Sequence, residues 1–93
     1  MAEVEVQASD LGPRYEFEVA VRERGSVTHH RVTLGKADYE RLAGDRASPE
    51  ALVAESFRFL LEREPKEAIL RSFDLTVIGH YFPEYERLIT RRL

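Results

Sequence analysis

Residues 14–34 of this 93-residue chain, RYEFEVAVRERGSVTHHRVTL, decide its fold class. Apolar and polar side chains alternate along 14–23 and again along 27–34. This two-residue period is typical of strands that bury one face. An Arg-Gly turn signal separates the two runs, so the sequence predicts an antiparallel β-hairpin.

Parity sets the register of this hairpin. A loop of two or four residues places Phe17 opposite Val32 and Glu18 opposite Arg31. A three-residue loop would slip the register by one, set Phe17 against Thr33 and mix the two faces. Arginine is a poor first residue for the tightest turns, which require positive φ there. The sequence therefore predicts an even number of loop residues but does not decide between two and four.

Helical spacing follows the hairpin. Ser48, Pro49 and Glu50 combine an N-cap hydroxyl, a first-turn proline and an acid that complements the helix dipole. The predicted helices span 36–43, 49–63, 66–82 with a break near 73, and 84–92. Residues 3–8 alternate only weakly, which leaves open whether they add an edge strand.

These elements predict an α+β fold in a single domain spanning 1–93, because this length does not hold two independent cores. An N-terminal antiparallel hairpin, or three strands over 3–8, 14–23 and 27–34, packs on three or four short helices. Phe57, Leu60 and Leu61 lie on the apolar stripe of the best-capped helix, so we expect all three to be largely buried.

The composition excludes several classes of protein. The chain has 14 basic and 17 acidic residues and no cysteine, which removes disulfides, thiolate nucleophiles and Cys-based zinc sites. No apolar run approaches the ~20 residues that span a bilayer, and no signal segment opens the chain. We therefore expect a cytoplasmic protein with no membrane contact. Twelve arginines against two lysines, with few amide side chains, fit a thermophile or a GC-rich genome.

Residues that could carry chemistry are scattered. The glycines are isolated and form no phosphate loop, and no serine lies in a nucleophile-elbow context. His29 and His30 point to opposite faces of a strand and cannot share a metal ion. His30 shares the apolar face, where we expect a hydrogen-bonded histidine at the core margin. The sequence thus predicts no catalytic, cofactor-binding or metal-binding residue and no cofactor, and a small enzyme is kept as an alternative hypothesis.

Residues 29–63 run in the order strand, short helix, loop and serine-capped helix. This order resembles the ribbon-helix-helix family of DNA-binding dimers, in which a strand from each subunit enters the major groove. The resemblance implies outward-facing reading residues at His29, Arg31 and Thr33, and a phosphate held by the amides after Ser48. It would make the chain a DNA-binding or antitoxin-type regulator.

Several features oppose that interpretation. The first helix is about a turn shorter than that family has, and the strand over 14–23 precedes the reading strand. Glu18 is expected beside Arg31, and an acidic neighbour opposes the approach of phosphate. We therefore expect no nucleic-acid binding of physiological strength.

Residues 59–86, FLLEREPKEAILRSFDLTVIGHYFPEYE, resemble a group of short uncharacterised bacterial proteins. The resemblance implies no activity and no site residues, and it leads us to expect a complete small protein. The sequence as a whole therefore favours a small non-catalytic binding or adaptor module. Its expected partner is another protein or a second copy of the chain in a homodimer.

Overall fold

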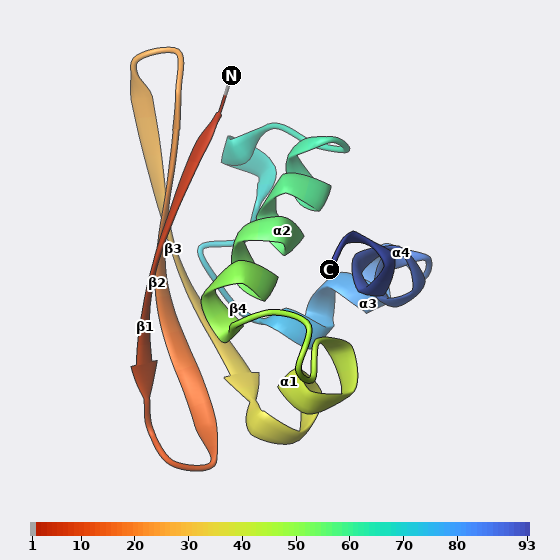
Figure 1. Cartoon of the computed structure of the whole chain (residues 1–93). Helices are drawn as coiled ribbons and strands as arrows, with labels where there is room; N and C mark the ends of the chain where they lie inside the picture. Colours follow the sequence, from red (N-terminus) through yellow and green to blue (C-terminus); the bar gives the residue numbers. More distant parts are fainter. Residues whose placement is uncertain (1) are drawn as a thin grey trace.

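The computed structural model describes residues 2–93 as a four-stranded sheet with the helices on one of its faces (Figure 1). The strands are β1 (Glu3–Asp10), β2 (Arg14–Glu23), β3 (Ser26–Gly35) and β4 (Ser72–Asp74), in that spatial order. The helices are α1 (Lys36–Leu42), α2 (Pro49–Leu61), α3 (Ile78–Tyr81) and α4 (Tyr85–Arg92), with 3₁₀ turns η1 (Lys66–Ala68) and η2 (Leu75–Val77). This arrangement confirms the predicted α+β class.

The hairpin has the predicted register. Phe17 pairs with Val32, and Glu18 pairs with Arg31. The loop is the two-residue one, and both of its residues have positive φ, 55° at Arg24 and 78° at Gly25. This turn matches the right-handed twist of the strands, although it places an arginine in the left-handed region.

The open question of a third strand is resolved by β1, which pairs antiparallel with β2 along its whole length. Its inward side chains Val4 and Val6 pack against the main core, and its outward side chains are polar. The sheet therefore starts with an eight-residue strand whose other edge has no neighbour among the described residues.

The predicted helix over 66–82 is wrong. The segment instead forms η1, then β4, then η2 and α3. β4 pairs in parallel with β3, so that Phe73 lies beside Val32 and packs on Phe57 of α2 at 5.9 Å between ring centroids. Asp74 accepts a hydrogen bond from the Thr33 hydroxyl at 2.8 Å and caps η2. These long-range contacts outweigh the local helical spacing.

The remaining helices agree with their predicted bounds to within two residues. Ser48 caps α2 by accepting a hydrogen bond from the Ala51 amide at 3.1 Å. Phe57 and Leu60 are buried as expected. Leu61 is only partly buried, contrary to expectation, because it is the last residue of α2 and no further turn covers it.

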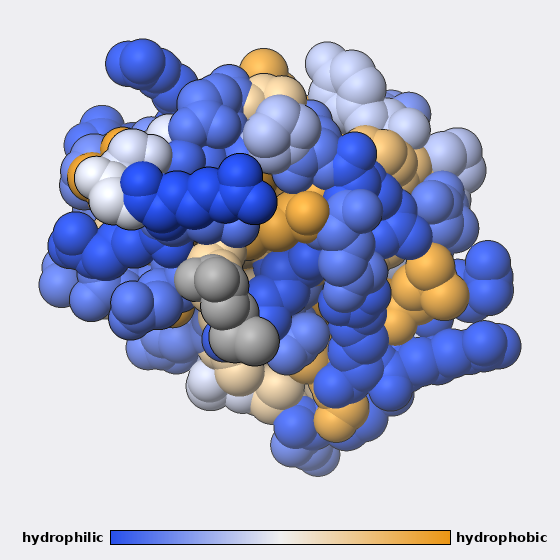
Figure 2. Space-filling model, turned by 90° about the horizontal axis from the view of Figure 1, so that it is seen from above, coloured by the Kyte–Doolittle hydropathy of each residue, from blue (hydrophilic) through white to orange (hydrophobic). Residues whose placement is uncertain are grey.

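No helix within residues 2–93 is long and apolar enough to cross a membrane. Figure 2 shows that, on the face seen from above, hydrophobic side chains reach the surface only in separate spots between hydrophilic ones. An apolar recess of the surface lies beside α2.

Candidate ligand-binding groove

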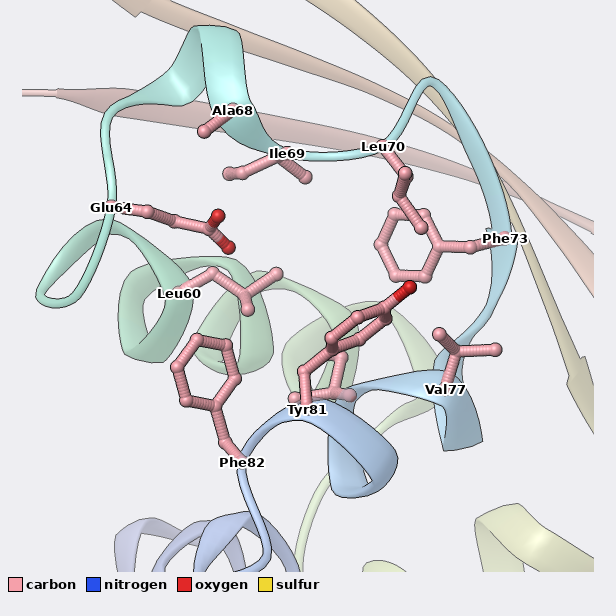
Figure 3. A pocket seen from close by; sticks show the side chains of 10 residues that line it. Leu60, Glu64, Ala68, Ile69, Leu70, Phe73, Val77, Tyr81 and Phe82 are labelled. Carbon is pink, nitrogen blue, oxygen red and sulfur yellow. The ribbon is translucent and has the colours of Figure 1, made fainter.

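A groove of about 200 Å³ opens where α2, η1, β4 and α3 meet (Figure 3). It is lined by Leu60, Glu64, residues 68–70, Phe73, residues 77–78 and residues 81–82. We call it the α2–α3 groove. Nine of its residues are apolar or aromatic, and Glu64 is the one charged residue that lines it.

The aromatic walls of the groove are anchored on α2. Phe73 packs on Phe57, and Phe82 stacks edge-on against Phe59, each at 5.9 Å between ring centroids. Both α2 rings are fully buried in the core. Because packed aromatic pairs hold their rings in place, we expect a largely preformed site.

Two large side chains at the mouth of the groove, one apolar and one aromatic, are strongly exposed to solvent. Leu70 is 48% exposed and Tyr81 is 68% exposed. A helix over 66–82 would have aligned apolar residues on one inward face, whereas the strand and turns that form instead leave these two outside the core. Leu70 and Tyr81 therefore extend the apolar surface of the groove beyond its mouth.

The carboxylate of Glu64 points toward the groove in Figure 3. It makes no ion pair with any side chain of the described residues, and the neighbouring Arg63 is directed to the Phe59 ring and to Glu84. Partial burial raises the pKa of Glu64 above its ordinary value. A carboxylate that is partly desolvated and lacks a cation gains from a cationic ligand group.

The size of the groove limits what it can hold. Pockets for drug-sized ligands and cofactors measure roughly 300–1,000 Å³, and this groove measures about 200 Å³. It has room for one or two side chains rather than for a nucleotide. Its chemistry suits an apolar group that carries a cation or a hydrogen-bond donor.

A second hollow of about 240 Å³ lies between β3 and η1 and is more polar. Its floor includes His30, which is 2% exposed and hydrogen-bonded on both ring nitrogens. Nδ1 donates to the Leu70 carbonyl and Nε2 accepts from the Thr28 hydroxyl, each at 2.8 Å. Burial lowers the pKa of His30. The expected hydrogen-bonded histidine at the core margin is confirmed, and neither nitrogen is free for a ligand.

Lys66 lies at the rim of the same hollow and is 5% exposed. Its ammonium group pairs at 2.6 Å with Glu67, whose side chain is 63% exposed. This pair gives the buried amine a partner, so Lys66 does not leave an unpaired charge in the hollow as the partly buried Glu64 does in the groove.

Three of the four nucleic-acid candidates, His29, Arg31 and Thr33, share the face of β3 that points away from the core, and Ser48 lies apart from them. His29 and Arg31 lie on the open face of the sheet, where Arg31 pairs with Glu18 at 3.0 Å and with Glu16 at 4.0 Å. Thr33 donates its hydroxyl to Asp74. Ser48 lies in the helical layer, where its side chain caps α2.

The position of β3 also differs from that of a ribbon strand. β3 lies between β2 and β4 in the sheet, with β4 covering residues 31–33. A strand that is paired on both edges has no free backbone groups there for a second subunit.

Sequence reasoning missed Glu64 as a site residue. Its place before Pro65 indicated only the end of a helix, and α2 does end shortly before it. The signal that was available is an acid followed closely by the apolar residues Ala68, Ile69 and Leu70. Their convergence depends on β4, which the local pattern did not predict.

Comparisons with protein-family models, curated proteins and solved structures found no match to this chain. Within residues 2–93, no cluster of three His, Cys, Asp or Glu side chains is placed to hold a metal ion.

Proposed function

We propose that this chain is a non-catalytic binding module that holds a short segment of a partner protein in the α2–α3 groove. The segment presents one apolar side chain to the groove and one lysine or arginine to Glu64. The observation that carries the proposal is the half-buried Glu64 carboxylate, which faces an apolar recess without a cationic partner.

The dimensions support a peptide side chain over a small-molecule cofactor. A recess of about 200 Å³ accommodates a leucine or phenylalanine side chain, while the exposed Tyr81 and Leu70 extend the apolar contact beyond it. Interfaces concentrate their binding energy in such anchors, with aromatic residues and arginine prominent among them. A basic side chain in the segment would restore a partner to the carboxylate.

A panel of acetylated nine-residue peptides tests the proposal. Each peptide carries a central Phe or Leu on an Ala/Ser background, with Lys at one to four residues from it, and a matched set carries Glu in place of Lys. Binding is followed by ¹⁵N NMR titration of the whole chain. We expect the Lys set to shift amides around the groove and to bind about fivefold more tightly than the Glu set, which corresponds to about 1 kcal/mol for one partly screened charge pair.

Two variants make the result specific. Glu64→Gln keeps the shape of the side chain and should abolish the difference between the Lys and Glu peptides. Glu40→Gln makes the same charge change on exposed helix α1, away from the groove, and should leave that difference intact. Equal binding of both peptide sets to the unmodified protein, or shifts confined to residues outside the groove, would contradict the proposal.

A further inference from the structure

The two edges of the sheet are unlike each other. The β4 edge is three residues long, whereas the β1 edge runs over eight residues without a proline or lysine. A long edge strand presents a row of free backbone donors and acceptors, and proteins usually block such an edge with charged side chains, above all lysine, or with proline, a bulge or a covering element. β1 carries the acids Glu3, Glu5 and Asp10, but among the described residues it has no lysine, proline, bulge or covering element.

Backbone hydrogen bonding identifies the groups on this free edge. The Leu11 amide donates to the Arg14 carbonyl at 2.9 Å and closes the turn between β1 and β2. Hydrogen-bonded and non-hydrogen-bonded pairs alternate along an antiparallel ladder. The backbones of Glu3, Glu5, Gln7 and Ser9 therefore bond to β2. Those of Val4, Val6 and Ala8 point outward, with their N–H and C=O groups unpaired by the ladder.

We propose that two copies of the chain pair through this edge, β1 against β1 in antiparallel orientation, to form a continuous eight-stranded sheet. The two-fold axis passes beside Val6. The resulting pairs are Val6 with Val6, Val4 with Ala8, Glu5 with Gln7 and Glu3 with Ser9. The outward backbone groups of residues 4–8 then form about six hydrogen bonds between the two copies.

Charge and face parity select this register. In a continuous sheet the core-facing side chains of both β1 strands lie on the same side. Even-numbered residues therefore pair with even-numbered ones, which requires the two-fold axis to pass beside a residue and not between two residues. An axis at Glu5 would set the two Glu5 side chains against each other, and an axis at Val4 would set Glu3 against Glu5. An axis at Gln7 would place Val4 opposite Asp10. With the axis at Val6, no acid lies directly opposite another acid. Because like charges that lie opposite each other destabilise a pair of strands, this register is favoured.

The side chains of β1 are compatible with pairing. Val4 and Val6 are half-buried at the rim of the core, so a second β1 would cover the apolar surface that remains. Glu5 is held by Arg22 on the adjacent strand at 2.9 Å, which partly neutralises the acid nearest to the axis. An interface built on one strand pair is small, so we expect dissociation in the micromolar range.

Sedimentation equilibrium of the whole chain tests the pairing. We expect a mass that rises with concentration from the 10.8 kDa monomer to twice that value. Ala8→Pro removes an outward N–H and leaves the ladder to β2 intact, so it should weaken the dimer at least tenfold without lowering the monomer's melting temperature by more than a few degrees. Ala8→Val keeps the N–H and should retain the dimer. A chain that stays monomeric up to about 0.5 mM would overturn the proposal, as would equal dimerisation of both variants.

The register has its own test at Gln7. With the axis at Val6, Gln7→Lys sets a lysine against Glu5 of the other copy, whereas Gln7→Glu sets two acids together. We expect the first change to tighten the dimer several-fold and the second to weaken it by a similar factor. If both changes weaken the dimer equally, Gln7 faces itself and the proposed axis is wrong.

Discussion

The buried hydrogen bond between Ser56 and Tyr85 joins α2 to α4 and gives a sharp test of the core. Both side chains are fully buried, and their oxygen atoms lie 2.7 Å apart. The Ser56 hydroxyl also lies 2.8 Å from the Leu52 carbonyl, which can only accept. The single serine proton must therefore go to Leu52, and Tyr85 must donate its proton to Ser56.

This direction of donation makes the two single substitutions unequal. Ser56→Ala leaves the Tyr85 hydroxyl buried without an acceptor, which costs about 1–3 kcal/mol. The higher helix propensity of alanine offsets up to roughly 0.5 kcal/mol of that loss. Tyr85→Phe removes a neutral hydrogen bond and leaves Ser56 still donating, so it should cost only about 0.5–1.5 kcal/mol. The double variant removes both partners and should cost no more than Ser56→Ala alone.

Urea unfolding followed by circular dichroism measures these free energies of unfolding. A larger loss of stability for Tyr85→Phe than for Ser56→Ala, or losses that simply add in the double variant, would contradict this direction of donation. The free energy of unfolding measured at alkaline pH provides a second test. Burial raises the pKa of Tyr85 above its value in the unfolded chain, so the folded state loses stability as pH rises above about 10. Tyr85→Phe should remove that part of the pH dependence.

Three further predictions use the same unfolding assay or a binding assay. Leu60→Ala should destabilise the fold toward the lower end of about 2–5 kcal/mol, because one side of Leu60 faces the groove, and a loss below about 1 kcal/mol would contradict its place in the core. The lowered pKa of His30 means that stability should fall as pH drops below about 6.5, where the unfolded histidine binds a proton first, and His30→Asn should flatten this dependence. The chain should not bind random duplex DNA at about 0.15 M salt; micromolar, salt-sensitive binding abolished by Arg31→Ala would make the ribbon-helix-helix interpretation the leading one.

The hairpin could be predicted because its information is local. Alternation along two neighbouring runs and the parity of one turn suffice to pair Phe17 with Val32. The capping of α2 by Ser48 is local in the same sense. Phe17 and Val32 lie 15 positions apart and Ser48 and Ala51 lie three apart, so at both places a local sequence pattern translates directly into geometry.

The groove could not be predicted, because it depends on partners distant in sequence. The spacing of Ala68, Ile69 and Phe73 fits a helix, yet Phe73 pairs with Val32 of β3 instead. The bond from Thr33 to Asp74 joins residues 41 positions apart. No local period encodes that pairing, and the pairing is what brings Phe73 to the wall of the groove.

The two proposed surfaces lie at opposite edges of the sheet, and this placement has a consequence for binding. β4 borders the α2–α3 groove, while β1 forms the far edge. In a dimer joined through β1 the two β4 strands would be separated by seven strand spacings, or about 34 Å. The grooves would then open at the two flanks, free to engage two segments of one partner. A peptide with two Lys-bearing segments and a flexible linker long enough to span this distance should bind the unmodified protein more tightly than a single segment does. Ala8→Pro should remove that gain and leave the affinity for the single segment unchanged, whereas Glu64→Gln should weaken binding of both peptides.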